Sequence, residues 1–192
     1  TLNGYATDDV IAGLGGNDQI YGNGGNDTLN GGVGNDMLDG GYGNDTYLFG
    51  RDDGQDVISS SEWNRAKQDV MQFKDGVLAT DVEASRNGDS LVLKIAGTTD
   101  QLTLQNYFSY DGTFNPYGVE SIRFADESAV WTYADVKSKV LVATESNDTV
   151  HGFGSDDAIA GLGGDDQLYG NGGSDTMDGG AGNDTLNGGV GN

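Results

Sequence analysis

A nine-residue unit, with a glycine-rich start, an acidic residue and an apolar residue two positions later, repeats through two parts of the chain. The clearest copy is GGVGNDMLD at residues 31–39. We call residues 1–48 the first ladder and residues 143–192 the second ladder. The acidic position recurs at every ninth residue in each ladder, at Asp9, Asp18, Asp27, Asp36 and Asp45, and at Asp148, Asp157, Asp166, Asp175 and Asp184. Ten copies in phase predict a periodic fold.

A period of nine residues is too short for a helical repeat and is typical of parallel β-helices, in which each unit supplies a strand and a tight turn. Glycine suits such turns because it adopts positive φ at little steric cost. We expect an all-β fold with right-handed parallel β-roll (β-helix) blocks at 1–48 and 143–192. A flexible linker is the alternative, but a linker has no reason to place a large apolar residue at every ninth position.

Residues 49–142 differ in kind, because glycine becomes rare and strand-like alternation replaces the repeat. Residues 49–58 keep Gly54 and Asp56 at the wrong spacing and are interpreted as the exit from the first ladder. Strands are expected at 69–73, 81–85, 91–95, 101–104, 119–124 and 129–131. A hairpin is expected at 87–89 and a short helix at 133–140 after Thr132. This segment is predicted to be a small, mostly antiparallel β capping unit, with Trp63, Phe73, Phe108, Phe124 and Trp131 available for its core.

The charge balance favours cations as partners. The chain has 31 acidic and 9 basic residues, with a formal net charge of -22, and no basic residue lies in either ladder. Nucleic acids and anionic membranes are recognised by Lys/Arg patches, so this composition argues against both, and membrane contact is not expected. The absence of cysteine excludes disulfides and thiolate metal sites. The chain begins and ends within a repeat, so we interpret it as an excerpt from a longer protein.

The acidic positions need cations if the repeats stack. Two nonapeptides per coil would place acidic residues 18 positions apart in the sequence at neighbouring turns, about 4.8 Å apart in space. Unit charges at that distance repel by roughly 1 kcal/mol in water and by several at an effective dielectric constant near 20. Ca²⁺ accepts carboxylates and carbonyls in flexible geometry, whereas Mg²⁺ requires strict octahedral geometry. With no cysteine and a single histidine, Zn²⁺ and Cu²⁺ lack their usual ligands.

These repeats resemble a known family. GGVGNDMLD, GGYGNDTYL and GGAGNDTLN are similar to the nonapeptides of RTX (repeats-in-toxin) proteins, the haemolysin-type calcium-binding family whose repeats wind into calcium-loaded parallel β-rolls. Residues 46–50 (TYLFG), 86–98 (RNGDSLVLKIAGT) and 102–108 (LTLQNYF) also resemble the segment that flanks repeat blocks in adenylate-cyclase-type RTX toxins.

The resemblance implies a ligand set for each ion. One turn gives the carbonyls of its second and fourth residues and its Asp; the turn two repeats later gives the carbonyls of its first and third residues and its Asp. The first ladder then holds Tyr5, Thr7 and Asp9 with Gly22, Gly24 and Asp27; Leu14, Gly16 and Asp18 with Gly31, Val33 and Asp36; and Asn23, Gly25 and Asp27 with Gly40, Tyr42 and Asp45. The second ladder holds Thr144, Ser146 and Asp148 with Gly161, Gly163 and Asp166; Phe153, Ser155 and Asp157 with Gly170, Gly172 and Asp175; and Leu162, Gly164 and Asp166 with Gly179, Ala181 and Asp184.

Some positions depart from the family pattern. Thr7, Ser146 and Ser155 replace the glycine at the fourth position, which predicts weaker sites at these turns. The second glycine is replaced more widely, at Tyr5, Leu14, Asn23, Phe153, Leu162 and Asn171. A carbonyl ligand survives such a replacement where the backbone angle is kept.

Catalytic interpretations are disfavoured. His151 is the single histidine and occupies a strand position of a repeat, so a Ser-His-Asp triad centred elsewhere is excluded. The acidic pairs 52–53 and 126–127 fall at turn-like sites, where solvated turns are favoured over glycosidase carboxylates.

The sequence therefore predicts a non-enzymatic, calcium-binding RTX module of a secreted, toxin-associated bacterial protein, located outside the cell. About six calcium ions would complete its sites and drive folding, which in this family is linked to type I secretion. End-to-end self-association through the uncapped second ladder, with fraying near residue 190, is also expected. Two alternatives stay open: an adhesion or ligand-binding module that uses residues 49–142, and an ice-binding β-roll, for which the exposed threonine array is irregular.

Overall fold

The computed structural model describes residues 1–59, 67–109, 118–125 and 129–191. They form two compact units, Thr1–Tyr133 and Ala134–Asn192. The segment predicted as a separate cap, 49–142, is divided between these units at residue 133. Among the described residues, no helix is both long and apolar enough to cross a membrane. Trp63 and the acidic pair 126–127 lie outside the described residues.

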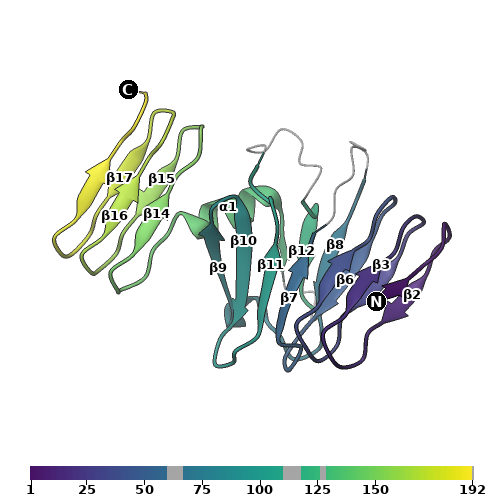
Figure 1. Cartoon of the computed structure of the whole chain (residues 1–192). Helices are drawn as coiled ribbons and strands as arrows, with labels where there is room; N and C mark the ends of the chain where they lie inside the picture. Colours follow the sequence, from purple (N-terminus) through teal and green to yellow (C-terminus); the bar gives the residue numbers. More distant parts are fainter. Residues whose placement is uncertain (60–66, 110–117, 126–128, 192) are drawn as a thin grey trace. The chain divides into compact units, whose positions relative to one another are not determined.

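The strands of the first ladder alternate between two parallel sheets (Figure 1). The register joins residues 18 positions apart, such as Ile20 with Leu38 and Leu29 with Tyr47. Two nonapeptides therefore make one coil, as the periodicity predicts. One sheet contains β1 (Leu2–Asn3), β3 (Gln19–Tyr21), β5 (Met37–Asp39) and β7 (Gln55–Ile58); the other contains β2 (Val10–Ala12), β4 (Thr28–Asn30), β6 (Thr46–Phe49) and β8 (Val70–Phe73).

The segment that follows the first ladder extends both of its sheets. β11 (Gln101–Leu104) pairs in parallel with β7, and antiparallel β10 (Ser90–Ile95) and β9 (Val82–Asn87) follow it after the 3-10 turn Ala79–Asp81 in the chain. β12 (Ser121–Arg123) pairs in parallel with β8, and β13 (Val130–Trp131) is antiparallel to β12. The predicted hairpin at 87–89 is confirmed. The interpretation of 49–58 as an exit from the ladder is wrong, because β7 pairs with β5.

Apolar residues from both sheets fill the space between them. Ile20, Leu29, Leu38 and Tyr47, each two positions after a repeat aspartate, are buried. Further along the roll, the aromatic core predicted from the sequence is confirmed for its described members, since Phe73, Phe108, Phe124 and Trp131 are all buried. The Phe73 ring stacks on Phe124, and Phe124 meets Trp131 edge-on.

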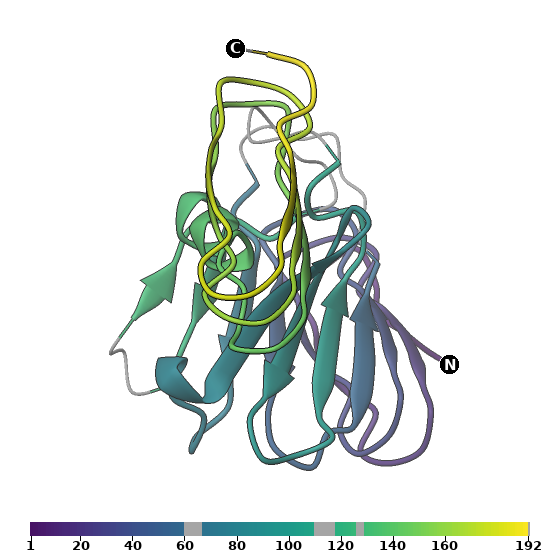
Figure 2. The ribbon, with the colours of Figure 1, turned by 90° about the vertical axis from the view of Figure 1, so that its left-hand side faces the viewer.

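The second unit repeats the architecture of the first ladder. Helix α1 (Tyr133–Val140) precedes it, and its strands form two parallel sheets whose coils lie one behind another in Figure 2. Ile159 and Leu168 are buried, whereas Leu186 in the last strand is 45% exposed. Burial thus fades toward the C-terminal coil. The sheets contain β14 (Thr149–His151), β16 (Gln167–Tyr169) and β18 (Thr185–Asn187), and β15 (Ala158–Ala160) and β17 (Thr176–Asp178).

Candidate metal centre

The repeat aspartates lie in rows along the turns of each roll. We call Asp9, Asp27 and Asp45 row A, and Asp18 and Asp36 row B. Each later Asp accepts a hydrogen bond at Oδ1 from the backbone N–H of the Asp 18 residues before it. This contact joins all the aspartate pairs predicted from the sequence: Asp9–Asp27 (2.8 Å), Asp18–Asp36 (2.7 Å), Asp27–Asp45 (2.9 Å), Asp148–Asp166 (2.8 Å), Asp157–Asp175 (3.0 Å) and Asp166–Asp184 (3.0 Å).

The second carboxylate oxygen of these residues is the unusual feature. Within the described part of the chain, several of these Oδ2 atoms are buried without a hydrogen-bond partner, although a buried charged oxygen normally has one. Burial raises the pKa of Asp27 and of Asp36, against the N–H bonds that lower it. The oxygens belong to Asp27, Asp36, Asp56, Asp166 and Asp175.

The turns around these oxygens are tight. A Cβ on Gly31 would lie 2.3 Å from Oδ2 of Asp36, and one on Gly22 would lie 2.2 Å from Oδ2 of Asp27. Only glycine therefore lets the backbone approach the carboxylate at the first position of the repeat.

The second repeat position keeps its left-handed conformation without glycine. Leu14, Asn23, Leu162 and Asn171 have φ of 71°, 75°, 67° and 70°, a conformation that costs roughly 1–2 kcal/mol for an ordinary residue. The turn geometry is thus preserved at these positions, as carbonyl ligation would require. The assignment of individual carbonyls as ligands remains a prediction.

The turns at 4–9, 143–148 and 152–157, which we call the leading turns, are built differently. Their second and fourth residues do not adopt positive φ. Instead, the N–H of Tyr5, Thr144 and Phe153 donates to Oδ2 of the Asp in the same turn, at 2.7, 2.8 and 2.5 Å. The carboxylate is satisfied by its own turn there, in agreement with the weaker sites predicted at Thr7, Ser146 and Ser155.

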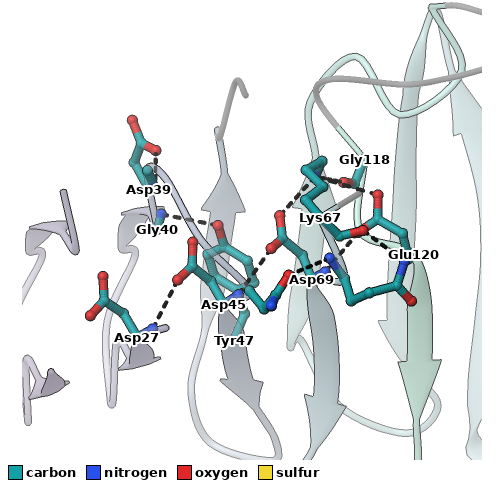
Figure 3. A network of polar contacts seen from close by, with 12 residues as sticks. Asp27, Asp39, Gly40, Asp45, Tyr47, Lys67, Asp69, Gly118 and Glu120 are labelled. Carbon is teal, nitrogen blue, oxygen red and sulfur yellow. Dashed lines mark hydrogen bonds and ion pairs between the residues drawn. The ribbon is translucent and has the colours of Figure 1, made fainter. Parts of the chain in front are cut away.

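Sequence periodicity misses two further members of the rows. Asp36 N–H donates to Oδ1 of Asp56, 20 residues later, at 2.9 Å. Asp45 N–H donates to Oδ1 of Asp69, 24 residues later, also at 2.9 Å (Figure 3). Row B therefore continues to Asp56 and row A to Asp69, although both spacings break the nonapeptide period.

Lysines lie beside several of these turns. Lys67 Nζ contacts Oδ2 of Asp69 at 2.7 Å and donates to the carbonyl of Gly118 (Figure 3). In the second unit, Lys137 of α1 donates to Ser155 at 2.6 Å and lies 3.5 Å from Oδ1 of Asp157. Protein ammonium groups thus reach carboxylates at the end of row A and at a leading turn.

The donor set fits a hard cation. No group of three or more His, Cys, Asp or Glu side chains is arranged for a metal ion among the residues that the structure describes. Each step of a row offers two carboxylates, and turn carbonyls are the remaining donors nearby. Calcium binds six to eight oxygens of these kinds. His151 stacks on Tyr169, with ring centroids 4.7 Å apart, in the strand position expected for it.

Comparison with known proteins decides the family. The RTX calcium-binding nonapeptide repeat matches four times, at residues 3–38, 21–58, 140–168 and 161–192. The chain belongs to this haemolysin-type RTX family. The haemolysin-type calcium binding protein related domain matches residues 91–135, within the predicted flanking segment. The resemblance read from the nonapeptides is therefore confirmed, and the chain carries calcium-binding repeats.

Two relatives place the chain within longer proteins. "Iron-regulated protein FrpA" of Neisseria meningitidis serogroup C is 39% identical over 110 residues, which are 57% of this RTX chain and 10% of that relative. Among solved structures, the extracellular lipase LipA from Serratia marcescens aligns over 98% of this chain and 27% of its own, with 19% identity and a TM-score of 0.38. The RTX chain thus spans a small part of each relative.

Proposed function

We propose that this RTX chain is a non-enzymatic module of a secreted bacterial protein, and that it winds into β-rolls when it binds Ca²⁺ outside the cell. The observation that supports it most strongly is the set of buried Oδ2 atoms, such as those of Asp27 and Asp166, that no described group satisfies. A protein does not bury such oxygens without a partner unless a ligand completes them. The family to which the repeats belong binds calcium, and a divalent cation supplies the missing charge.

Charge repulsion would keep the ladders unwound without calcium. The chain carries a net charge of -22, and the ladders hold no basic residue. Neighbouring carboxylates in a row repel by several kcal/mol at an effective dielectric constant near 20, which exceeds what short strands of three residues recover. Calcium reverses the sign of this interaction, so binding and folding are coupled.

The affinity expected for such sites matches a switch between compartments. Extracellular calcium modules bind at about 0.1–1 mM, so the chain would stay unwound in the cytoplasm and fold after export. An unwound chain passes a narrow secretion channel more readily than a folded one. About six complete sites are expected from the paired repeats of both ladders.

Circular dichroism tests this function directly. The chain is measured in chelator and then with millimolar Ca²⁺, with Mg²⁺ at equal ionic strength as the control. We expect a disordered spectrum in chelator and in Mg²⁺, and a β spectrum with Ca²⁺. A β spectrum that persists in chelator would refute calcium-coupled folding.

We further propose that residues 49–142 cap the first ladder. An open roll end exposes unpaired strand edges, and β11 and β12 cover the outer edges of β7 and β8. Comparing residues 1–48 alone with residues 1–133 by calcium-dependent circular dichroism tests this role. Folding of the longer chain only is expected, and equal folding of both would contradict the cap.

A further inference from the structure

Row B ends in a carboxylate that the nonapeptide pattern does not include. Asp56 follows Asp36 by 20 residues, yet its Oδ1 accepts the Asp36 N–H at 2.9 Å, within the range found in the repeats. Gly34 and Gly54 form a parallel bridge beside this step, as Gly15 and Val33 do one coil earlier. The Asp36–Asp56 step thus has the geometry of a repeat step without the repeat sequence.

Both carboxylates of this step are buried and incompletely satisfied. Asp36 and Asp56 are 2% and 1% exposed. Neither Oδ2 atom has a hydrogen-bond partner among the described residues. Burial raises the pKa of Asp56 to about 7, with smaller upward contributions from the charges of Asp36 and Asp53. An anionic pair in this place requires a positive charge that its neighbours do not provide.

The nearest lysine is already fully engaged. Lys74 Nζ contacts Oδ1 and Oδ2 of Asp53 at 2.9 and 2.7 Å and Oδ1 of Asn30 at 2.7 Å. An ammonium group has three hydrogens to donate, so these contacts use them all. Lys74 therefore neutralises Asp53 and leaves the Asp36–Asp56 pair without a bonded cation.

Row A shows what the end of a row demands. Asp69 continues row A as Asp56 continues row B, and its Oδ2 is held by Lys67 at 2.7 Å. The chain thus places its own cation at one row end and leaves the other with two unpartnered oxygens. We propose that Asp36 and Asp56 together hold a divalent cation of the calcium type, at a step of the roll outside the nonapeptide repeats.

This site rests on the proposed calcium function and adds to it. Carboxylate and carbonyl oxygens are the donors within reach, which favours Ca²⁺ over softer metals, and Ca²⁺ tolerates the irregular turn better than Mg²⁺. Whereas the repeat sites need two nonapeptides, this one joins the last full nonapeptide of row B to the flanking segment. It therefore couples the first ladder to the sheets that extend it.

Isothermal titration of the full chain with CaCl₂ tests the site. Asp56→Asn keeps the acceptor for the Asp36 N–H but removes the charge, so the stoichiometry should fall by about one ion per chain. Asp52→Asn is the matched control: it removes one charge from the same turn, at an exposed residue with φ of 67°, which Asn tolerates. Its stoichiometry should equal that of the wild type.

The outcomes separate this site from the general function. A wild-type chain that binds no Ca²⁺ overturns the proposed function, whereas equal stoichiometry for the wild type and Asp56→Asn overturns only the Asp36–Asp56 site. If Asp56→Asn fails to fold, calcium anomalous scattering from wild-type crystals decides. A peak between Asp36 and Asp56 supports the site, and its absence beside occupied repeat sites refutes it.

Discussion

The ammonium of Lys67 lies 2.7 Å from Oδ2 of Asp69, and both side chains are 1% exposed. Glu120 completes this buried cluster, with Oε1 3.6 Å from Lys67 and Oε2 accepting the Asp69 N–H at 2.7 Å. Row A thus ends on a cation that belongs to the protein, which makes this end of the first unit independent of added metal.

Removal of that cation should destabilise the first unit. Lys67→Met leaves Asp69 buried opposite a neutral side chain, and breaking a buried ion pair in this way costs about 3–5 kcal/mol. Both tryptophans, Trp63 and Trp131, lie within residues 1–133, so urea unfolding followed by tryptophan fluorescence in saturating Ca²⁺ reports this unit.

A second lysine serves as the control for that experiment. Lys94 lies in β10 and is exposed, so Lys94→Met should change the stability by less than about 0.5 kcal/mol. Similar losses for both variants would show that the buried pair has no special weight.

Aspartates inside a row should matter more for calcium binding than those at its start. Asp27 accepts the N–H of Asp9 and donates its own N–H to Asp45, so it takes part in two pairs, whereas Asp9 takes part in one. Asp27→Asn should remove about two ions per chain and Asp9→Asn about one, as measured by calcium titration calorimetry. Equal losses would mean that neighbouring sites do not share a carboxylate.

The left-handed leucine of the first ladder offers a stabilising change. Leu14 has φ of 71° and is 78% exposed, so Leu14→Gly relieves backbone strain without loss of packing. We expect a gain of about 0.5–1 kcal/mol and a lower calcium midpoint for folding by circular dichroism. Val10→Gly is the counterpart, since Val10 is 86% exposed in a strand. It should instead destabilise by about 0.5–1 kcal/mol; a shift of the same sign in both variants would contradict the strain argument.

The repeat itself could be predicted because its period encodes both the strands and the rows. One residue of each unit is apolar and faces inward, as Leu29 does, and one is acidic and faces its neighbour 18 residues away, as Asp27 does. The pairing of these positions needs no long-range information, since every coil has the same length.

The extension of the rows could not be predicted, because it depends on distant contacts. The turn before Asp56 holds two additional residues, and it is shaped by Asp100, whose carboxylate accepts the N–H of Asp52 and of Gly54 at 3.0 and 2.9 Å. Likewise, composition shows that every lysine lies outside the ladders, but only the fold shows that Lys67 returns to the end of row A.

The buried cluster at that row end should make stability depend on pH. Burial raises the pKa of Glu120 to about 7, although Lys67 and the Asp69 N–H act to lower it. The folded chain then holds a proton that the unfolded chain releases near its ordinary value of 4.5, so stability falls as pH rises through 7. The expected loss between pH 6 and pH 8 is about 1 kcal/mol.

Glu120→Gln should remove this dependence, because glutamine cannot ionise and keeps an oxygen for the Asp69 N–H. Urea unfolding of the wild type and the variant at both pH values, in saturating Ca²⁺ with tryptophan fluorescence, measures the difference. Glu83→Gln changes an exposed residue of β9 and should keep the wild-type slope. If Glu120→Gln keeps that slope as well, the proton is bound elsewhere, and the end of row A is not the pH-sensitive part of the first unit.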